Sequence, residues 1–324
     1  MFMYTILITG AGQLGSRYLQ GLANCQQTLS IIVHDISEDS LIVAKNRWNE
    51  VTFDKSFHHI NFISTLKYLP DEIDLVIVST SSHVRSRLIK EIVQKTIKIK
   101  YFILEKVLGQ NGNQIDSIIE DTKTAQGVWV NTPLRAMSWY NEINKAMSDS
   151  KGRFNSIING GITFALASNA IHYLDLLCWF LGETVDNINT DKLDKVWVKS
   201  KRSGFWDIYG TLNVTFSDGS HLTISSQKEE LSKVTININY ENNESWIINE
   251  FDCKAFRNDG LCIEGRIEFQ SELTPSIVDE ILSKGSCRLP SLSESAVIHK
   301  IFLKEMLSHW NLNMPRSLTK LPIT

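Results

Sequence analysis

The chain has 324 residues, a formal net charge of −3 and an apolar fraction of 43%, which allows two domains with a substantial core. This charge offers no field for a polyanion, so nucleic acid is not the expected partner. No apolar run approaches the roughly 20 residues that span a bilayer, so a membrane protein is not expected either. Five scattered cysteines without a Cys-x-x-Cys pair argue against a zinc site or disulfide frame and favour a cytoplasmic protein.

The stretch from Thr5 to Asp35 carries the strongest pattern. Met1 to Ile8 is apolar but has no basic leader, so it is predicted to be a first strand rather than a signal peptide. Glycines then follow at Gly-x-Gly-x-x-Gly spacing before a helix-like segment and a second apolar run. Such glycines give a tight turn, close approach to a pyrophosphate and close helix packing. The residues predicted to hold a dinucleotide here are Gly10, Gly12, Gln13, Leu14 and Gly15.

Asp35 lies twenty residues beyond Gly15 and ends the second apolar run. A carboxylate at this position accepts a hydrogen bond from the adenosine ribose 2′-hydroxyl and repels a 2′-phosphate. No arginine or lysine occurs in Ile36–Asp39. The pattern therefore favours NAD over NADP, although Ser37 leaves NADP open.

The next elements continue the alternation of strand and helix. Leu75–Val78 is predicted as a strand buried on both faces, and the polar loop after it lies at the sheet edge where ligands bind. Thr80, Ser81 and His83 in that loop are candidate cofactor contacts; capping of the helix Val84–Gln94 is the alternative. The pair His58–His59 has no neighbouring ligand residue and is interpreted as surface.

A strand over Lys98–Leu104, a helix over Gly112–Thr124 and a strand over Val128–Asn131 complete this half. Strands that alternate with helices predict an α/β Rossmann domain with a doubly wound parallel sheet.

Beyond residue 150 strands follow one another, with Asp218–Gly219 as a hairpin signal. They are expected at Phe154–Phe164, Lys195–Lys199, Ile208–Phe216, His221–Ser225, Val234–Tyr240 and Trp246–Asn249. One helix, Asn169–Leu181, interrupts them, and another starts near Pro290 and runs to Trp310. This pattern predicts an α+β domain with a largely antiparallel open sheet. The expected domains are residues 1–124 (dinucleotide binding), 125–290 (substrate and oligomerisation) and 291–324 (C-terminal helix and tail).

Together these motifs resemble the glucose–fructose oxidoreductase and inositol dehydrogenase family (Gfo/Idh/MocA). The resemblance rests on the N-terminal GAGQLG, on Glu105–Lys106–Val107 in place of Glu-Lys-Pro, and on the helix residues Asn169–Asp175. It covers nearly the whole chain. Leu321–Thr324 and Ser79–Ser82 look more like members found with polysaccharide-building enzymes.

The resemblance implies hydride transfer between a nicotinamide and a hydroxyl or keto carbon of a sugar, sugar acid or nucleotide sugar. It places Glu105 beside the nicotinamide, Lys106 near both the nicotinamide ribose and the reacting hydroxyl, and His172 as the acid/base. A histidine titrates near neutrality and a lysine ammonium stabilises a developing alkoxide, so these roles suit the residues. The resemblance also implies a homo-oligomer, a dimer or tetramer, through the open sheet.

Two departures from the family pattern stand out. Val107 replaces a proline that follows the lysine in a cis peptide. Ser168 replaces an aspartate that often lies four residues before the histidine, and a serine carries no charge at neutral pH. Asn169, Thr163 or Asp175 are the candidates to take over that aspartate's part in binding.

The predicted substrate site therefore comprises Lys106, Arg135, Ser168, Asn169 and His172. Arg135 is expected to face the domain junction and to bind an anionic group of the substrate, or else to be an ordinary surface arginine. Because of the two departures, a sensor or accessory protein that binds NAD and a sugar without turnover stays as the alternative function. No metal site is predicted.

Overall fold

The computed structural model describes residues 3–52, 56–147, 152–161, 164–228 and 234–324. Contacts within the chain group it into two units. The first contains Met1–Gly109, Asn113–Pro133 and Glu268–Ser293, and the second contains Gln110–Gly112, Leu134–Ile267 and Glu294–Thr324. The three-part domain division expected from the sequence stays a prediction.

A six-stranded parallel sheet forms the centre of the first unit, in the order β3-β2-β1-β4-β5-β6. Side chains in the middle of β1 and β4 have no exposed surface, as expected for strands covered on both faces. The predicted doubly wound α/β fold is thereby confirmed. The strands are β1 (Met3–Thr9), β2 (Thr28–His34), β3 (His59–Ile63), β4 (Glu72–Val78), β5 (Lys98–Glu105) and β6 (Gly127–Asn131).

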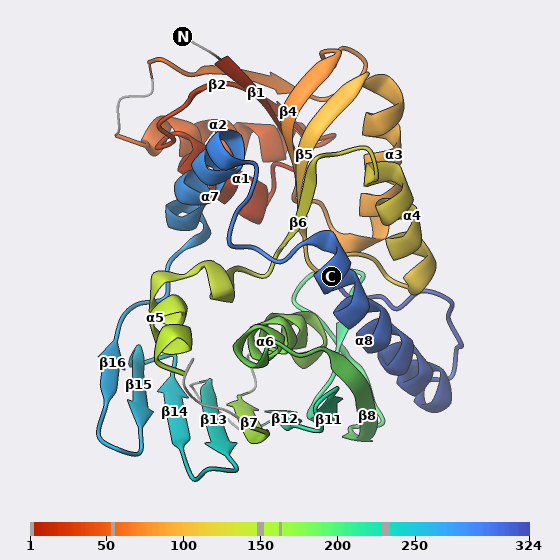
Figure 1. Ribbon diagram of the computed structural model, residues 1–324. Helices are drawn as coiled ribbons and strands as arrows, with labels where there is room; N and C mark the ends of the chain where they lie inside the picture. The colour runs from red at the N-terminus through yellow and green to blue at the C-terminus, as the bar shows by residue number, and fades with distance from the viewer. Residues whose placement is uncertain (1–2, 53–55, 148–151, 162–163, 229–233) are drawn as a thin grey trace. The chain divides into compact units, whose positions relative to one another are not determined.

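Helices cover both faces of this sheet. In Figure 1, α1, α2 and α7 lie on one side and α3 and α4 on the other. Sequence patterning missed α7, which contains Pro275. It packs closely on α1 at Gly21, which has no side chain; a Cβ there would lie only 2.5 Å from Thr274. The bounds are α1 (Gln13–Leu22), α2 (Glu38–Glu50), α3 (Ser82–Lys95), α4 (Gly112–Thr122) and α7 (Gln270–Lys284).

The second unit contains an eight-stranded sheet in the order β16-β15-β14-β13-β7-β12-β11-β8. Among its described strands only β7 and β12 pair in parallel, which confirms the predicted largely antiparallel sheet. Gly219 has a φ of +87° in the turn of the β11–β12 hairpin, which confirms that hairpin. The strands are β7 (Phe154–Gly160), β8 (Val185–Leu193), β11 (Gly210–Phe216), β12 (His221–Ser226), β13 (Thr235–Tyr240), β14 (Ser245–Asn249), β15 (Lys254–Arg257) and β16 (Cys262–Glu264).

Several predicted strand bounds were wrong. The first strand of this sheet ends at Gly160. The ring of Phe164 packs on this glycine so closely that a Cβ there would lie 2.4 Å from it. The predicted Lys195–Lys199 strand reduces to β9 (Val198–Lys199), which pairs with β10 (Trp206–Asp207) in a separate two-stranded ribbon. The edge strand β8 was missed because it buries few of its side chains and its register shifts twice against β11.

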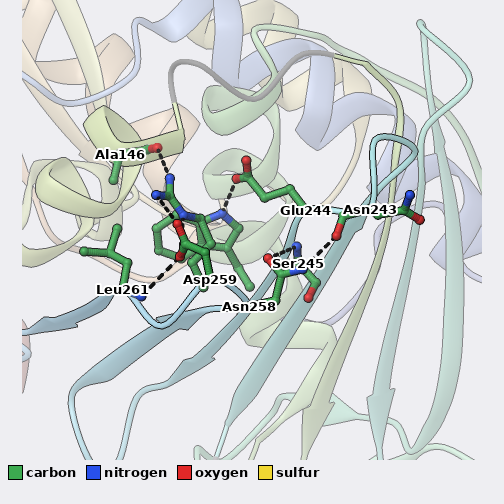
Figure 2. Close-up of polar contacts among 9 residues, drawn as sticks. Ala146, Asn243, Glu244, Ser245, Asn258, Asp259 and Leu261 are labelled. Atoms are coloured by element: carbon green, nitrogen blue, oxygen red, sulfur yellow. Dashed lines mark hydrogen bonds and ion pairs between the residues drawn. The ribbon is translucent and has the colours of Figure 1, made fainter.

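Helices α5 (Ser138–Met147) and α6 (Leu166–Leu181) lie on one face of this sheet (Figure 1). Near its β16 edge, the tips of the β13–β14 and β15–β16 hairpins are connected by polar contacts, among them the side-chain amide of Asn258 donating to the carbonyl of Asn243 at 2.8 Å (Figure 2). On β7, β14 and β15 of this sheet, Ile157, Ile247 and Phe256 are 43–52% exposed. Self-association through this sheet stays a prediction.

The long helix α8 (Leu292–Asn313) matches the predicted C-terminal helix. No helix in the described part of the chain is long and apolar enough to cross a bilayer. The prediction that His58 lies at the surface was wrong. Its ring is buried, and its Nδ1 accepts the N–H of Leu29, on β2, at 3.2 Å.

Candidate active site

Three glycines shape the turn between β1 and α1. Gly10 has a φ of +90°, which glycine adopts without steric cost, and its N–H donates to the carbonyl of His34 at 2.8 Å. A Cβ on Gly15 would lie 1.7 Å from the carbonyl oxygen of Gly10, whereas one on Gly12 would meet nothing within 4 Å. The turn thus presents bare backbone at the N-terminus of α1. This arrangement suits a diphosphate.

Asp35 ties the end of β2 to this turn. Its Oδ2 accepts the N–H of Ala11 at 2.7 Å, and its Oδ1 accepts the N–H of Ser37 at 2.9 Å. A carboxylate oxygen accepts two hydrogen bonds, so each oxygen has capacity for a ribose hydroxyl as well. The predicted pyrophosphate and ribose residues therefore come together in one place.

Arg47 on α2 was missed from the sequence, although it lies at the start of α1. Its guanidinium donates to the backbone carbonyl of Gln13 at 3.0 Å and to the side chain of the same residue at 2.5 Å. The side chain of Gln13 is therefore engaged within the protein. Leu14, the next predicted residue, is half-buried.

A cavity of about 270 Å³ opens beside Asp35. Two buried atoms in residues of its wall, His34 Nδ1 and Thr80 Oγ1, have no hydrogen-bond partner among the described residues, and Ile36 is 86% exposed. Buried polar atoms without partners beside exposed apolar carbon are what a nucleoside would cover. The lining residues are Gly10, His34, Asp35, Ile36, Ser64, Thr65, Leu66, Thr80, Val84, Arg87, Leu88 and Glu91.

Burial lowers the pKa of His34 below its ordinary value, against the opposing charges of Asp35 and Glu91. The imidazole is thus neutral at pH 7, with one nitrogen able to donate and the other to accept. Of the lining residues, Gly10, Asp35 and Thr80 were predicted. Ser64, Arg87 and their neighbours were not, because only the fold brings β3 and α3 beside β2.

The loop after β4 is connected to the glycine turn. The hydroxyl of Ser79 shares its one hydrogen between the carbonyls of Thr9 and Gly10, at 2.9 and 2.6 Å. Ser81 occupies the N-cap of α3 without a capping bond from its side chain. His83 is exposed; partial burial and then the charges of Arg87 and Arg85 lower its pKa. Cofactor contacts by Ser81 and His83 stay predictions.

Glu105 closes β5 with a buried side chain. Its Oε1 accepts from the hydroxyl of Tyr18 at 2.6 Å and from the amide of Asn131 at 2.7 Å. Burial raises the pKa of this carboxyl, and the two hydrogen bonds and the charges of Arg85 and Lys106 partly offset the increase. Glu105 thus anchors the strand end from which Lys106 follows.

The Lys106–Val107 peptide bond is cis, as the family pattern places it, although valine replaces proline. The buried guanidinium of Arg85 donates to the carbonyls of Val107 and Thr80. Arg85 therefore links the lysine loop to the loop after β4. Lys106 itself is half-buried in the first unit.

The second unit carries the other predicted residues on α6. Ser168, Asn169 and His172 occupy its first two turns, and all three are half-buried. The side-chain amide of Asn169 donates to the carbonyl of Phe164 at 2.6 Å. Residues four apart lie on one face of a helix, so Ser168 and His172 are neighbours. Thr163 lies outside the described residues.

Arg135 precedes α5 in the second unit. Its guanidinium lies 3.5 Å from Asp175 and 3.4 Å from Glu294, beside a cavity of about 310 Å³. Two carboxylates already offset its charge, so an incoming anion would have to compete with them. The predicted role of Arg135 in binding substrate stays a prediction. No group of three or more metal-binding side chains occurs in the described parts of the chain.

Comparison with known proteins gives a match at the level of structure. No protein-family model and no curated protein matches the sequence. Levoglucosan dehydrogenase in complex with NADH and L-sorbose has a TM-score of 0.69 at 13% identity, covering 95% of this chain and 98% of that one. Myo-inositol 2-dehydrogenase from Lactobacillus plantarum has a TM-score of 0.67 at 15% identity, covering 95% and 97%.

A third neighbour is a super-repressor mutant of Gal80p from Saccharomyces cerevisiae, with a TM-score of 0.73 at 12% identity, covering 95% and 96%. The chain shares the two-part fold of these proteins. The fold expected from the resemblance is therefore confirmed, with an inositol dehydrogenase among the neighbours.

Proposed function

We propose that this protein is an NAD(H)-dependent oxidoreductase that acts on a hydroxyl or keto carbon of a sugar, sugar acid or nucleotide sugar. The observation that carries the proposal is the cradle made by the glycine turn, Asp35 and the adjoining cavity. Bare backbone at Gly12, acceptor capacity on Asp35 and the unpartnered Thr80 Oγ1 suit a diphosphate, a ribose and a nucleoside. Two structural neighbours are named as sugar or inositol dehydrogenases.

NAD is the proposed form of the cofactor. The carboxylate of Asp35 faces the position expected for the ribose hydroxyls and repels a 2′-phosphate. Arg87 also lines the cavity and is the one cation there that attracts such a phosphate, among the described residues. Asp35 is held by two backbone hydrogen bonds, so its charge is fixed in place.

Lys106 and His172 are the proposed chemical groups. A bound nicotinamide supplies or accepts the hydride. Lys106, on the loop anchored by Glu105 and Arg85, donates to the reacting oxygen and stabilises negative charge that develops on it. His172 takes up or returns the proton of the same hydroxyl, a role that suits an imidazole near neutral pH.

A sensor that binds NAD and a sugar without turnover is the second candidate. It is favoured by Ser168, which leaves the first turn of α6 without a charged side chain of its own at this position. The Gal80p neighbour, named as a repressor, has the same fold. Turnover separates the two candidates.

The test begins with identification by mass of any nucleotide that co-purifies and is released by denaturation. Nicotinamide absorbance is then followed while the protein is mixed with a panel of sugars, sugar acids and nucleotide sugars. We expect NAD(H) and a change in absorbance with one compound class. Bound NAD(H) with no change across the panel would favour the sensor, and failure to bind either co-purified or added NAD(H) would refute both.

A further inference from the structure

A buried carboxylate from outside α6 lies against its first turn. Asp207, in β10, is 6% exposed. Its Oδ1 accepts the N–H groups of Ala167 and Ile208, each at 2.8 Å. Its Oδ2 accepts the hydroxyl of Ser168 at 3.3 Å. A carboxylate at a helix N-terminus interacts favourably with the helix dipole and with the free backbone N–H groups there.

The local backbone keeps this arrangement in place. Ala165, the N-cap of α6, has a φ of 54°, which is uncommon for a residue with a Cβ, and its side chain provides no cap. Asp207 therefore caps the helix from about forty residues further along the chain. The same side chain places a carboxylate oxygen beside Ser168.

We propose that Asp207 is the positioning residue of the substrate site and acts through Ser168. A serine hydroxyl has one hydrogen, and here that hydrogen points to Asp207. The oxygen of Ser168 is thereby committed to accept hydrogen bonds, one helical turn before His172. A substrate hydroxyl next to the one that reacts donates to this oxygen, which fixes the sugar relative to His172.

The 3.3 Å separation is longer than that of most O–H···O bonds. Catalytic hydrogen bonds are often long without substrate and shorten when it binds. The two described alternatives have other contacts, since Asp175 faces Arg135 and the amide of Asn169 donates to Phe164. The inference rests on the proposed oxidoreductase function and assigns the carboxylate that the α6 sequence lacks.

Asp207→Asn is the first test. The asparagine oxygen still accepts both backbone N–H groups, but its amide donates to Ser168 and reverses that hydrogen bond. Using the compound turned over in the panel, we expect KM to rise about tenfold with a smaller change in kcat, and NADH affinity to stay the same.

Ser168→Ala should raise KM by a similar factor. The double variant should have a KM little higher than either single variant, because the two side chains act through one contact. In the Asp207→Asn background, Ser168→Asp should lower the raised KM part of the way toward the wild-type value, because the new carboxylate supplies an acceptor directly. Asp259→Asn is the matched control, since that carboxylate also accepts a backbone N–H but lies exposed on the β15–β16 hairpin (Figure 2).

If the increases in KM of the two single variants multiplied in the double variant, the two side chains would act independently and the proposal would be overturned. An unchanged KM in Asp207→Asn would overturn it as well. A fall in melting temperature with unchanged KM would show that Asp207 only caps the helix. If wild type turns over no compound, the oxidoreductase proposal fails separately, and the same variants are compared in calorimetric binding of the panel with NADH present. Absence of sugar binding in wild type would then overturn this inference too.

Discussion

The two candidate sites differ in how far apart their parts lie in the sequence. In the first unit, the glycine turn and Asp35 fall within 26 residues and are joined by one hydrogen bond from Ala11 to Asp35. In the second unit, the start of α6 depends on Asp207, which belongs to a two-residue strand after β8 and β9. The first site is specified by a local motif. The second is specified by the tertiary fold.

This difference decides what each site tolerates. The glycine turn binds through its backbone, so it depends on these positions having no side chain. A site whose carboxylate comes from another element can have an uncharged residue on its helix, as α6 has Ser168, and still have a carboxylate nearby. Four predictions test this contrast, beginning with the largest effect.

Lys106→Ala and His172→Ala each remove one proposed chemical group, from the first and the second unit respectively. We expect turnover to fall by about 10²–10⁴-fold in each, while calorimetric affinity for NADH changes little in His172→Ala. A His172→Ala variant that loses NADH affinity and turnover together would show a structural histidine. An unaffected rate in Lys106→Ala would end its proposed role.

Gly15→Ala and Gly12→Ala separate folding from binding within the local motif. A Cβ on Gly15 collides with the backbone of Gly10, so the free energy of unfolding should fall by about 1–3 kcal/mol or more. A Cβ on Gly12 has free space, so Gly12→Ala should keep its stability and lose NADH affinity. Chemical denaturation and NADH titration of both variants test this, and undiminished affinity in Gly12→Ala would contradict the cradle.

Asp35 should select between the two nicotinamide cofactors. NADH is expected to bind at least about tenfold more tightly than NADPH, because a carboxylate repels the 2′-phosphate. In Asp35→Ser the preference should narrow, since Arg87 stays beside the cavity. Equal affinities of wild type for the two cofactors, measured by titration, would refute this selection.

The smallest expected effect concerns Glu250, the counterpart of Glu105 in the second unit. Its buried carboxyl accepts from the hydroxyls of Tyr140 and Tyr173 at 2.5 and 2.9 Å. Burial raises the pKa of Glu250, and both hydrogen bonds oppose this. The folded protein thus holds this proton more tightly than the unfolded chain does.

Glu250 therefore contributes stability at low pH, and that contribution is lost as pH rises from the unfolded value of about 4.3 through the folded pKa. Glu250→Gln has no such titration, so its melting temperature should improve relative to wild type between about pH 4.5 and 7. Parallel melting curves across that range would contradict the shifted pKa. Asp259→Asn serves as the control, because the wild-type Asp259 carboxyl has a pKa of about 2 and does not titrate in this range.

The same contrast explains how much could be predicted from the sequence. Glycine spacing, a buried apolar strand and Asp35 were sufficient for the first sheet and its cradle, because their partners are close in the chain. Arg47 and Arg87 reach that cradle from α2 and α3 and give no local signal. Asp207 was missed for the same reason, and the polar edge strand β8 lacks the alternation that reveals a strand.

The central claim is that the glycine turn and Asp35 hold a nicotinamide dinucleotide. It is tested most directly by calorimetric titration of NADH into wild-type protein freed of any co-purified nucleotide, with Gly12→Ala alongside. The account predicts saturable binding of NADH by wild type and clearly weaker binding by the equally stable Gly12→Ala. No binding to folded wild type at about 1 mM NADH, or equal binding by the two proteins, would contradict it.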